Sequence, residues 1–239
     1  MSHFDEIAEK YQEQIPEHIR RHYLGKKIKP ILSFLGSLGK RKHELVGLDL
    51  GCGLGWYTQE CFLQGYSNIV GLDSSKNEIK IARVTNPALN LVIGTAETLP
   101  FKGEIFDFVY SINMFHHLSK DSQISVFREV ERILGTEGYF FLHEINLLNP
   151  LFGLYMRYIF PRRKEYDTGE EEWVPTNKLR DFTRLELVRV EYFTFVPDFT
   201  PKCVFPMLRN IESALENTPL RKYGIHYLAT FRKARSIHE

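Results

Sequence analysis

Long apolar runs, paired cysteines and an excess of one charge are all missing from this chain of 239 residues. No stretch approaches the roughly 20 apolar residues that a membrane span needs. The amino terminus is too acidic for a signal peptide and lacks its apolar core. The three cysteines cannot all pair and show no metal-ligand spacing, so we expect a cytoplasmic setting and no metal site. A formal net charge of +1 creates no global field, so we expect no nucleic-acid partner.

What the sequence does contain is typical of one globular domain. Hydrophobic residues make up 43% and charged residues 26% of the chain, which is long enough to bury a large core. Residues 3–38 have helical spacing and predict two or three helices, with Pro16 and Pro30 near helix starts. We find no internal repeat.

From residue 44 onward, short apolar runs alternate with helical patterns. Strands are expected at 45–50, 68–72, 89–93, 106–112 and 139–143, and helices at 55–64, from Ser74 or Ser75 to about 84, and at 121–134. Later residues predict a short helix at 176–182, strands at 187–196 and 225–231, and a helix at 207–216. This alternation indicates an α/β fold with a doubly wound, mostly parallel sheet, which the late strands extend. Ligands of such sheets bind at the carboxyl ends of the strands.

The strongest local signal is the segment Asp49-Leu50-Gly51-Cys52-Gly53-Leu54-Gly55. Glycines between a strand and a helix let a ligand approach the backbone and the free N–H groups of the helix start. The dinucleotide fingerprint needs a further glycine where Trp56 stands. The carboxylate of Asp49 would repel a bound phosphate and would attract a cationic amino group. Asp73, at the end of the second expected strand, suits the hydroxyls of a ribose or the cap of a helix.

Five ordered segments resemble the successive motifs of class I S-adenosylmethionine-dependent methyltransferases. They are residues 46–58, 71–74, 94–101, 106–118 and 127–144. The resemblance is to the subgroup of ubiquinone, menaquinone and small-molecule methyltransferases (methyltransferase type 11), and the start of the chain from Phe4 to Tyr11 is also similar. It implies a seven-stranded sheet with N-terminal helices and a C-terminal helical insertion or lid. The single domain would divide into a helical cap (1–40), a cofactor-binding core (41–144) and a substrate-side region with the last strands (145–239).

The resemblance also implies which residues bind S-adenosylmethionine. The glycine turn with Asp49 would hold the methionine part, and Asp73 with Ser74 the ribose. Thr95 stands where the family usually has Asp, so its contact with adenine would lack a charge. The full set of expected cofactor-binding residues is Tyr11, Asp49, Gly51, Cys52, Gly53, Asp73, Ser74, Thr95, Ala96, Glu97, Ser111, Ile112 and His117.

Two side chains are candidates for catalysis on the acceptor side. His116 stands where the family varies and could take a proton from the acceptor, whereas His117 is expected to be structural or to face the cofactor. Glu144 ends the fifth expected strand and could serve as a base, contact the acceptor or bind a backbone amide. A base is needed only where the acceptor atom carries a proton.

The sequence leaves the acceptor open. The aromatic segment 152–160 suits a core or lid. Followed by basic residues 162–164, it could instead contact a membrane surface, but this partner is less favoured because the acids at 170–172 reverse the charge. We expect methyl transfer to a small-molecule or lipid-linked acceptor. The alternatives are an NAD-dependent oxidoreductase of similar topology and a non-catalytic S-adenosylmethionine-binding protein. The accepting atom and the oligomeric state are not fixed by the sequence.

Overall fold

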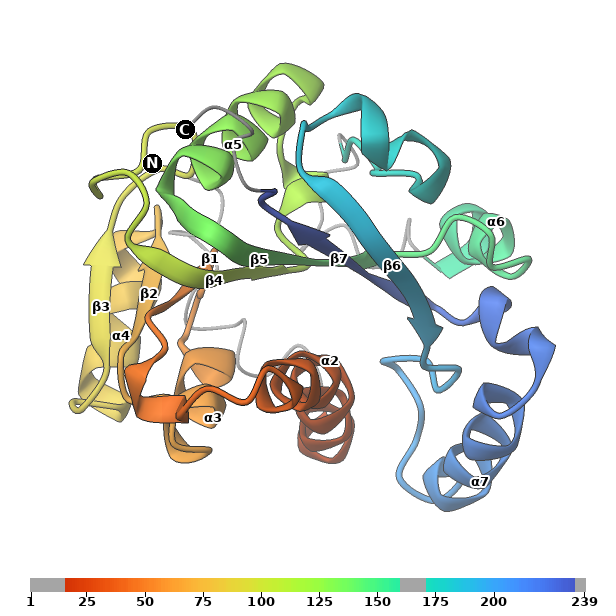
Figure 1. The fold of residues 1–239 in the computed structure, drawn as a ribbon. Coiled ribbons are helices and arrows are strands. Elements are labelled where there is room, and N and C mark those ends of the chain that lie inside the picture. The colour runs from red at the N-terminus through yellow and green to blue at the C-terminus, as the bar shows by residue number, and fades with distance from the viewer. Residues whose placement is uncertain (1–15, 160–170, 235–239) are drawn as a thin grey trace.

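The computed structural model describes residues 16–159 and 171–234, and these form one seven-stranded sheet covered by helices on both faces (Figure 1). The strand order is β3-β2-β1-β4-β5-β7-β6. The strands are β1 (Gly47–Leu50), β2 (Ile69–Asp73), β3 (Asn90–Ile93), β4 (Phe106–Ile112), β5 (Leu134–Ile145), β6 (Glu186–Phe193) and β7 (His226–Arg232). The strands from β3 to β5 pair in parallel, and β7 runs antiparallel to both β5 and β6. The expected mostly parallel, doubly wound sheet is confirmed.

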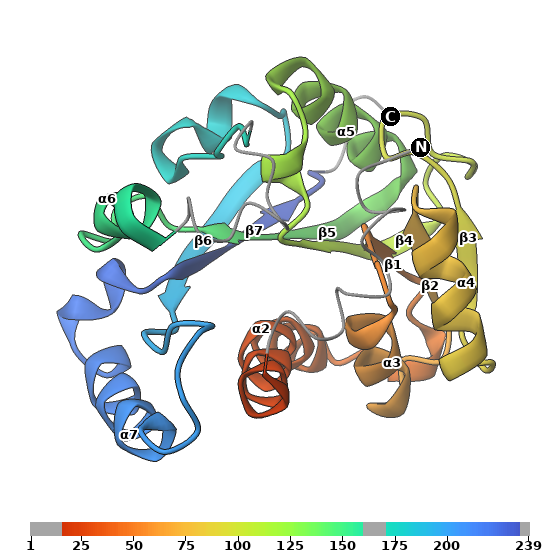
Figure 2. The same cartoon turned by 180° about the vertical axis from the view of Figure 1, so that it is seen from behind.

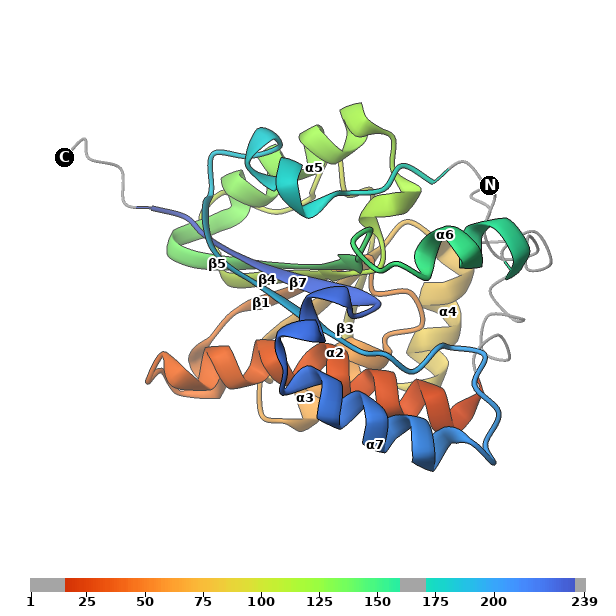
Figure 3. The ribbon, with the colours of Figure 1, turned by 90° about the vertical axis from the view of Figure 1, so that its right-hand side faces the viewer.

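Helices flank the sheet in two layers, which the side view in Figure 3 separates clearly. One layer contains α5, and the other contains α2, α3 and α7; Figure 2 shows the same two layers from behind. The α-helices are α2 (Glu17–Ser37), α3 (Trp56–Leu63), α4 (Lys76–Thr85), α5 (Lys120–Ile133), α6 (Phe152–Leu154) and α7 (Phe205–Glu216). The shorter helical segments are η1 (Lys42–Glu44), η2 (Phe115–His117), η3 (Tyr155–Ile159), η5 (Thr176–Asp181) and η6 (Pro219–Tyr223).

The core has one layer on each face because the strands alternate their side chains. Along the central strands, Val109 and Phe140 pack in the cluster of α5, whereas Tyr110 and Phe141 pack in the cluster of α2 and α3. All four side chains are buried. Strands buried on both faces read as continuous apolar runs, which explains why the sequence pattern located them.

Three local expectations are corrected by the structure. Pro30 lies inside α2, although it was expected near a helix start, and the packing of Ile28 and Ile31 on the sheet holds the helix through this position. α5 begins one residue earlier than the expected 121, and Ser119 caps it by accepting the Ser122 N–H at 3.2 Å. β5 begins directly after α5 and is longer than expected, since it pairs with β4 from Leu134 onward.

The late part of the chain is fixed to α2 through a buried carboxylate on α7. Glu212 accepts hydrogen bonds from the backbone N–H groups of Phe195 and Val196 and lies 2.7 Å from His22 Nε2. Although burial opposes ionisation, these bonds and the Lys26 charge lower the pKa of Glu212 to about 2. Among the described residues, no helix is both long and apolar enough to cross a membrane.

Candidate active site

The glycine segment forms a tight turn between β1 and α3 at the carboxyl edge of the sheet. Gly51, Gly53 and Gly55 have φ angles of 78°, 51° and 76°, a region that suits residues without a Cβ. A Cβ on Gly51 would lie 2.7 Å from Met114 Cγ, so this glycine allows close contact with the segment after β4. The turn is closed because the Leu72 carbonyl accepts from the Gly51 and Cys52 N–H groups at 2.8 and 3.0 Å. Cys52 itself is buried.

Asp73, at the tip of β2, organises this turn. Its carboxylate accepts from the Gly53 N–H and from the Ser75 N–H, both at 2.8 Å. Carboxylate oxygens have further lone pairs with which to accept ribose hydroxyls. Ser74 is exposed, and Ser75 caps α4 by accepting the Glu78 N–H. The structure therefore places Asp73 beside the glycine turn.

Asp49 lies on β1 next to Asp73 on β2, with Gly71 as its partner in the parallel register. The side chain is buried and accepts a hydrogen bond from Thr58 Oγ1 at 2.6 Å. Burial raises the pKa of Asp49 to about 7, against the opposing hydrogen bond from Thr58. Among the described residues no cation pairs with this buried carboxylate, which therefore favours a cationic ligand group such as the ammonium of S-adenosylmethionine.

The loop after β3 and the end of β4 border the same turn. Thr95 is exposed, Ala96 is buried in the core of the α5 face and Glu97 is half-buried. At the end of β4, Ser111 and Ile112 are buried, and Ser111 Oγ has no hydrogen-bond partner among the described residues. An orphaned buried hydroxyl at the end of β4 is a further polar group that a cofactor can satisfy.

His116 and Glu144, predicted separately, form a buried pair. His116 Nδ1 lies 2.6 Å from Glu144 Oε2, and Glu144 Oε1 accepts the Phe115 N–H at 2.8 Å. Both side chains are buried, and the Trp173 ring stacks on the His116 ring with centroids 5.2 Å apart. His117 is half-buried, and its ring lies 4.1 Å from the His116 ring. The glutamate thus binds a backbone amide and orients the histidine.

Sequence reasoning missed a second polar cluster beneath the tips of β5 and β7. Its members are Lys27 on α2, His143 on β5, directly before Glu144, and His226 at the start of β7. The two imidazole rings lie 4.9 Å apart, and His143 Nδ1 donates to Asn113 Oδ1 at 2.9 Å. Burial lowers the pKa of both histidines, and the Lys27 charge adds to this effect.

Lys27 itself is 4% exposed, and among the described residues its ammonium has no hydrogen bond or ion pair. Burial lowers the pKa of Lys27 to about 7, although the charges of Glu144 and Asp198 oppose the shift. Lys27 is four residues from Tyr23 and four residues from Ile31, both of which are buried, so it lies on the apolar stripe of α2. That position on the stripe is the signal through which this lysine could have been found.

Some expected features fall outside the described residues. Tyr11 lies there, as does the basic stretch 162–164. Among residues 16–159 and 171–234, no group of three or more His, Cys, Asp or Glu side chains could hold a metal ion.

The geometry agrees with comparison to known families. The family model described as "Methyltransferase domain" matches residues 48–142, which span β1 to β5 and contain the glycine turn and both acids. Residues 48–142 are thus a methyltransferase domain of the type 11 group, with the fold of class I S-adenosylmethionine-dependent methyltransferases. S-Adenosylmethionine is therefore its cofactor, and an NAD-dependent oxidoreductase is set aside.

Two yeast proteins are among the relatives of this methyltransferase domain. Both are named tRNA (carboxymethyluridine(34)-5-O)-methyltransferase. The Saccharomyces cerevisiae protein is 34% identical over 130 residues, which cover 53% of this chain and 46% of the relative. The Schizosaccharomyces pombe protein is 28% identical over 181 residues, which cover 70% and 75%. The match thus spans about half of the first relative's length. Sterol 24-C-methyltransferases are among the further relatives.

A solved structure with the same fold is the Haloferax volcanii methyltransferase in its complex with the Trm112 methyltransferase activator. It superposes with a TM-score of 0.61 at 20% identity and covers 82% of this chain and 84% of its own. These comparisons correct our expectation that nucleic acid is excluded as a partner. The expectation failed because net charge is a sum over the surface and says nothing of local clusters.

Proposed function

We propose that this methyltransferase transfers the methyl group of S-adenosylmethionine to an oxygen atom of a tRNA nucleoside. Support for tRNA comes from the two yeast relatives, whose names specify a tRNA uridine and an oxygen acceptor. Support for the chemistry comes from one observation, the buried His116–Glu144 pair beside the tip of β5.

The cofactor half of the site would consist of the residues around the glycine turn. Asp49 and the turn would hold the methionine part, and Asp73 the ribose. Ala96 and Glu97 would line the adenine, and the backbone at Ser111 and Ile112 would meet the amino group. When bound, S-adenosylmethionine supplies a methyl carbon that its sulfonium makes electrophilic.

The acceptor half would use His116 as a general base. Glu144 holds the ring through Nδ1 and would stabilise the imidazolium that forms when His116 takes a proton. The Phe115 N–H and the Trp173 ring fix the position of the pair. A carboxylate oxygen, such as that of the carboxymethyl group in the relatives' names, needs no base, so His116 would act as a base only where the acceptor oxygen carries a proton.

A small-molecule or lipid-linked acceptor is the competing proposal. It is favoured by the exposed apolar side chains of the segment after β5, which include Leu148, Leu151, Leu154 and Tyr158. The sterol methyltransferases among the relatives agree with it. An exposed apolar patch suits contact with a lipid-like molecule.

Labelled methyl transfer separates these proposals. The protein is incubated with S-adenosylmethionine carrying a tritiated methyl group and with either tRNA from cells that lack this protein or a lipid extract of the same cells. We expect label in nuclease-sensitive material, and digestion followed by mass spectrometry identifies the nucleoside. Label confined to the lipid extract contradicts the tRNA proposal and supports the competing one.

A further inference from the structure

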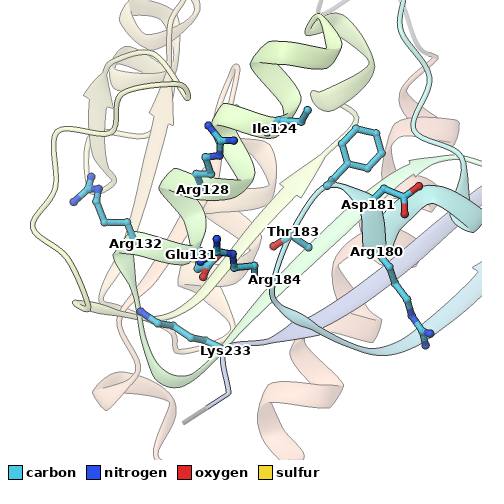
Figure 4. A pocket seen from close by; sticks show the side chains of 10 residues that line it. Ile124, Arg128, Glu131, Arg132, Arg180, Asp181, Thr183, Arg184 and Lys233 are labelled. Carbon is cyan, nitrogen blue, oxygen red and sulfur yellow. The ribbon is translucent and has the colours of Figure 1, made fainter. Parts of the chain in front are cut away.

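A cationic cleft lies on the outer surface of α5, apart from the acids and histidines at the strand tips (Figure 4). Its volume is about 720 Å³. One wall is α5, and the other is the segment from the end of η5 to the start of β6, with Lys233 at one end. Figure 4 shows Arg128 and Arg132 on α5, with Arg184 projecting from the facing segment.

Cationic side chains outnumber acidic side chains in the lining of the cleft. Two acids line it, Glu131 and Asp181. Five cations line it: Arg128, Arg132, Arg180, Arg184 and Lys233. Arg132 and Lys233 are paired with Glu129 and Glu104, which lie outside the lining, so Arg128, Arg180 and Arg184 are the cations of the cleft without an ion-pair partner among the described residues. A local cluster of this kind attracts polyanions even on a protein of nearly neutral net charge.

The cations fall into two groups according to their partners. Arg132 donates to the Phe101 carbonyl at 2.8 Å and pairs with Glu129. Lys233 donates to the Leu134 carbonyl at 2.8 Å and pairs with Glu104 at 3.0 Å, so both cations are anchored and neutralised. Arg128, Arg180 and Arg184 are exposed and, within the described part of the chain, have no hydrogen bond or ion pair. A guanidinium presents a planar fork of donors that matches a phosphate group.

The position of the cleft limits the size of a ligand that contacts both it and the site of methyl transfer. β7 begins at His226, opposite Ile145 at the carboxyl edge of the sheet. It ends at Arg232, opposite Tyr139 at the other edge, and Lys233 of the cleft follows directly. Six residues of strand span about 20 Å. A small metabolite cannot bridge this length, whereas a folded RNA can.

We propose that this cleft binds the phosphate backbone of an RNA acceptor, at a distance from the nucleoside that is methylated. The proposal rests on the proposed function, which supplies RNA as the acceptor. Arg128 and Arg184, on opposite walls, contact phosphates, whereas the charges of Arg132 and Lys233 are already paired with Glu129 and Glu104. The contacts are independent of base sequence, as is usual for phosphate recognition.

The test compares two double variants of the full chain. Arg128→Gln/Arg184→Gln removes two charges from the cleft, and Arg209→Gln/Arg221→Gln removes two exposed charges from α7 and η6. Binding of fluorescein-labelled tRNA is followed by anisotropy over a range of salt concentrations. We expect the cleft variant to bind about tenfold more weakly, with a salt slope reduced by about 2, and the control variant to match the parent protein. S-Adenosylhomocysteine affinity should stay unchanged in both variants.

The outcomes separate this proposal from the proposed function. If the parent protein methylates tRNA and the cleft variant keeps its affinity and salt slope, the cleft proposal is overturned and the function stands. If the cleft variant loses tRNA affinity but the parent transfers no methyl group to tRNA, the cleft proposal stands and the function falls. Absence of tRNA binding by the parent, or equal competition by inorganic phosphate at matched phosphate concentration, overturns the assignment to RNA.

Discussion

Along the carboxyl edge of the sheet, the tips of β1 and β2 carry acids and glycines, whereas the tips of β4, β5 and β7 carry histidines and face a lysine. Asp49 and Asp73 suit a cofactor with an ammonium, a sulfonium and a ribose. His116, His143 and Lys27 suit proton transfer or the binding of an anionic group. The difference teaches that one edge offers two halves of opposite electrostatic preference, and the acidic half can be tested separately from the histidine-rich half.

The largest expected effect concerns the acidic half. Asp73→Ala should weaken the binding of S-adenosylhomocysteine about 100-fold, because two charge-assisted hydrogen bonds to the ribose are lost and the Gly53 and Ser75 amides lose their acceptor. Isothermal titration measures the affinity. The exposed Asp121→Ala serves as the control. Full affinity in a folded Asp73→Ala protein would show that the ribose lies elsewhere.

A second large effect is expected in the histidine-rich half. His116→Ala should lower kcat for the acceptor about 100-fold while the KM for S-adenosylmethionine changes little, because a general base is removed and the cofactor half is untouched. Steady-state methyl transfer measures both constants. Glu144→Gln should lower kcat less, and the exposed His43→Ala should have no effect. An unchanged kcat in His116→Ala would mean that the acceptor oxygen carries no proton.

The pH dependence of cofactor binding sharpens the comparison further. Burial raises the pKa of Asp49 to about 7, so the carboxyl is mostly neutral below that pH and an ammonium binds only its ionised form. Affinity for S-adenosylhomocysteine should therefore rise about tenfold from about pH 6 to about pH 8. Titration in a pH series checks this, and Asp49→Asn should show no such rise. An equally steep rise in that variant would assign the titration to another group.

The smallest expected effect is on stability, and it compares two neighbouring lysines of α2. Burial lowers the pKa of Lys27 to about 7, so the folded protein binds this proton less tightly than the unfolded chain, and its stability should rise as the pH rises from about 7 to about 10. Lys27→Met should remove that rise and raise Tm at pH 7 by about 2–4 °C.

Lys26→Met is the matched control, since Lys26 pairs with Glu212 and Glu216, and its removal should lower Tm. Thermal unfolding monitored by circular dichroism measures both variants. A lower Tm in Lys27→Met would show that this lysine stabilises the fold.

The two halves of the edge also differed in how far they could be predicted. Asp49, the glycines and Asp73 were found because they are contiguous with strands whose apolar runs are plain in the sequence. His116 and Glu144 were each noted at a strand end, but their hydrogen bond joins residues 28 positions apart and could not be predicted from either segment. Thr95 was noted as a departure from the family, and the structure leaves its side chain exposed.

By itself, the sequence determined the sheet, its parallel core and the turn that belongs to a methyltransferase, because local periodicity and glycine conformation fix these features. Only the tertiary structure decided which distant side chains share a site. Lys27 lies near His143 and His226 because α2 packs across the sheet. Lys233 joins the arginines of α5 and of residues 180–184 because β7 returns antiparallel and carries it to that end of the sheet. Charge and proton chemistry depend on distances in space, and a net charge of +1 averages over them.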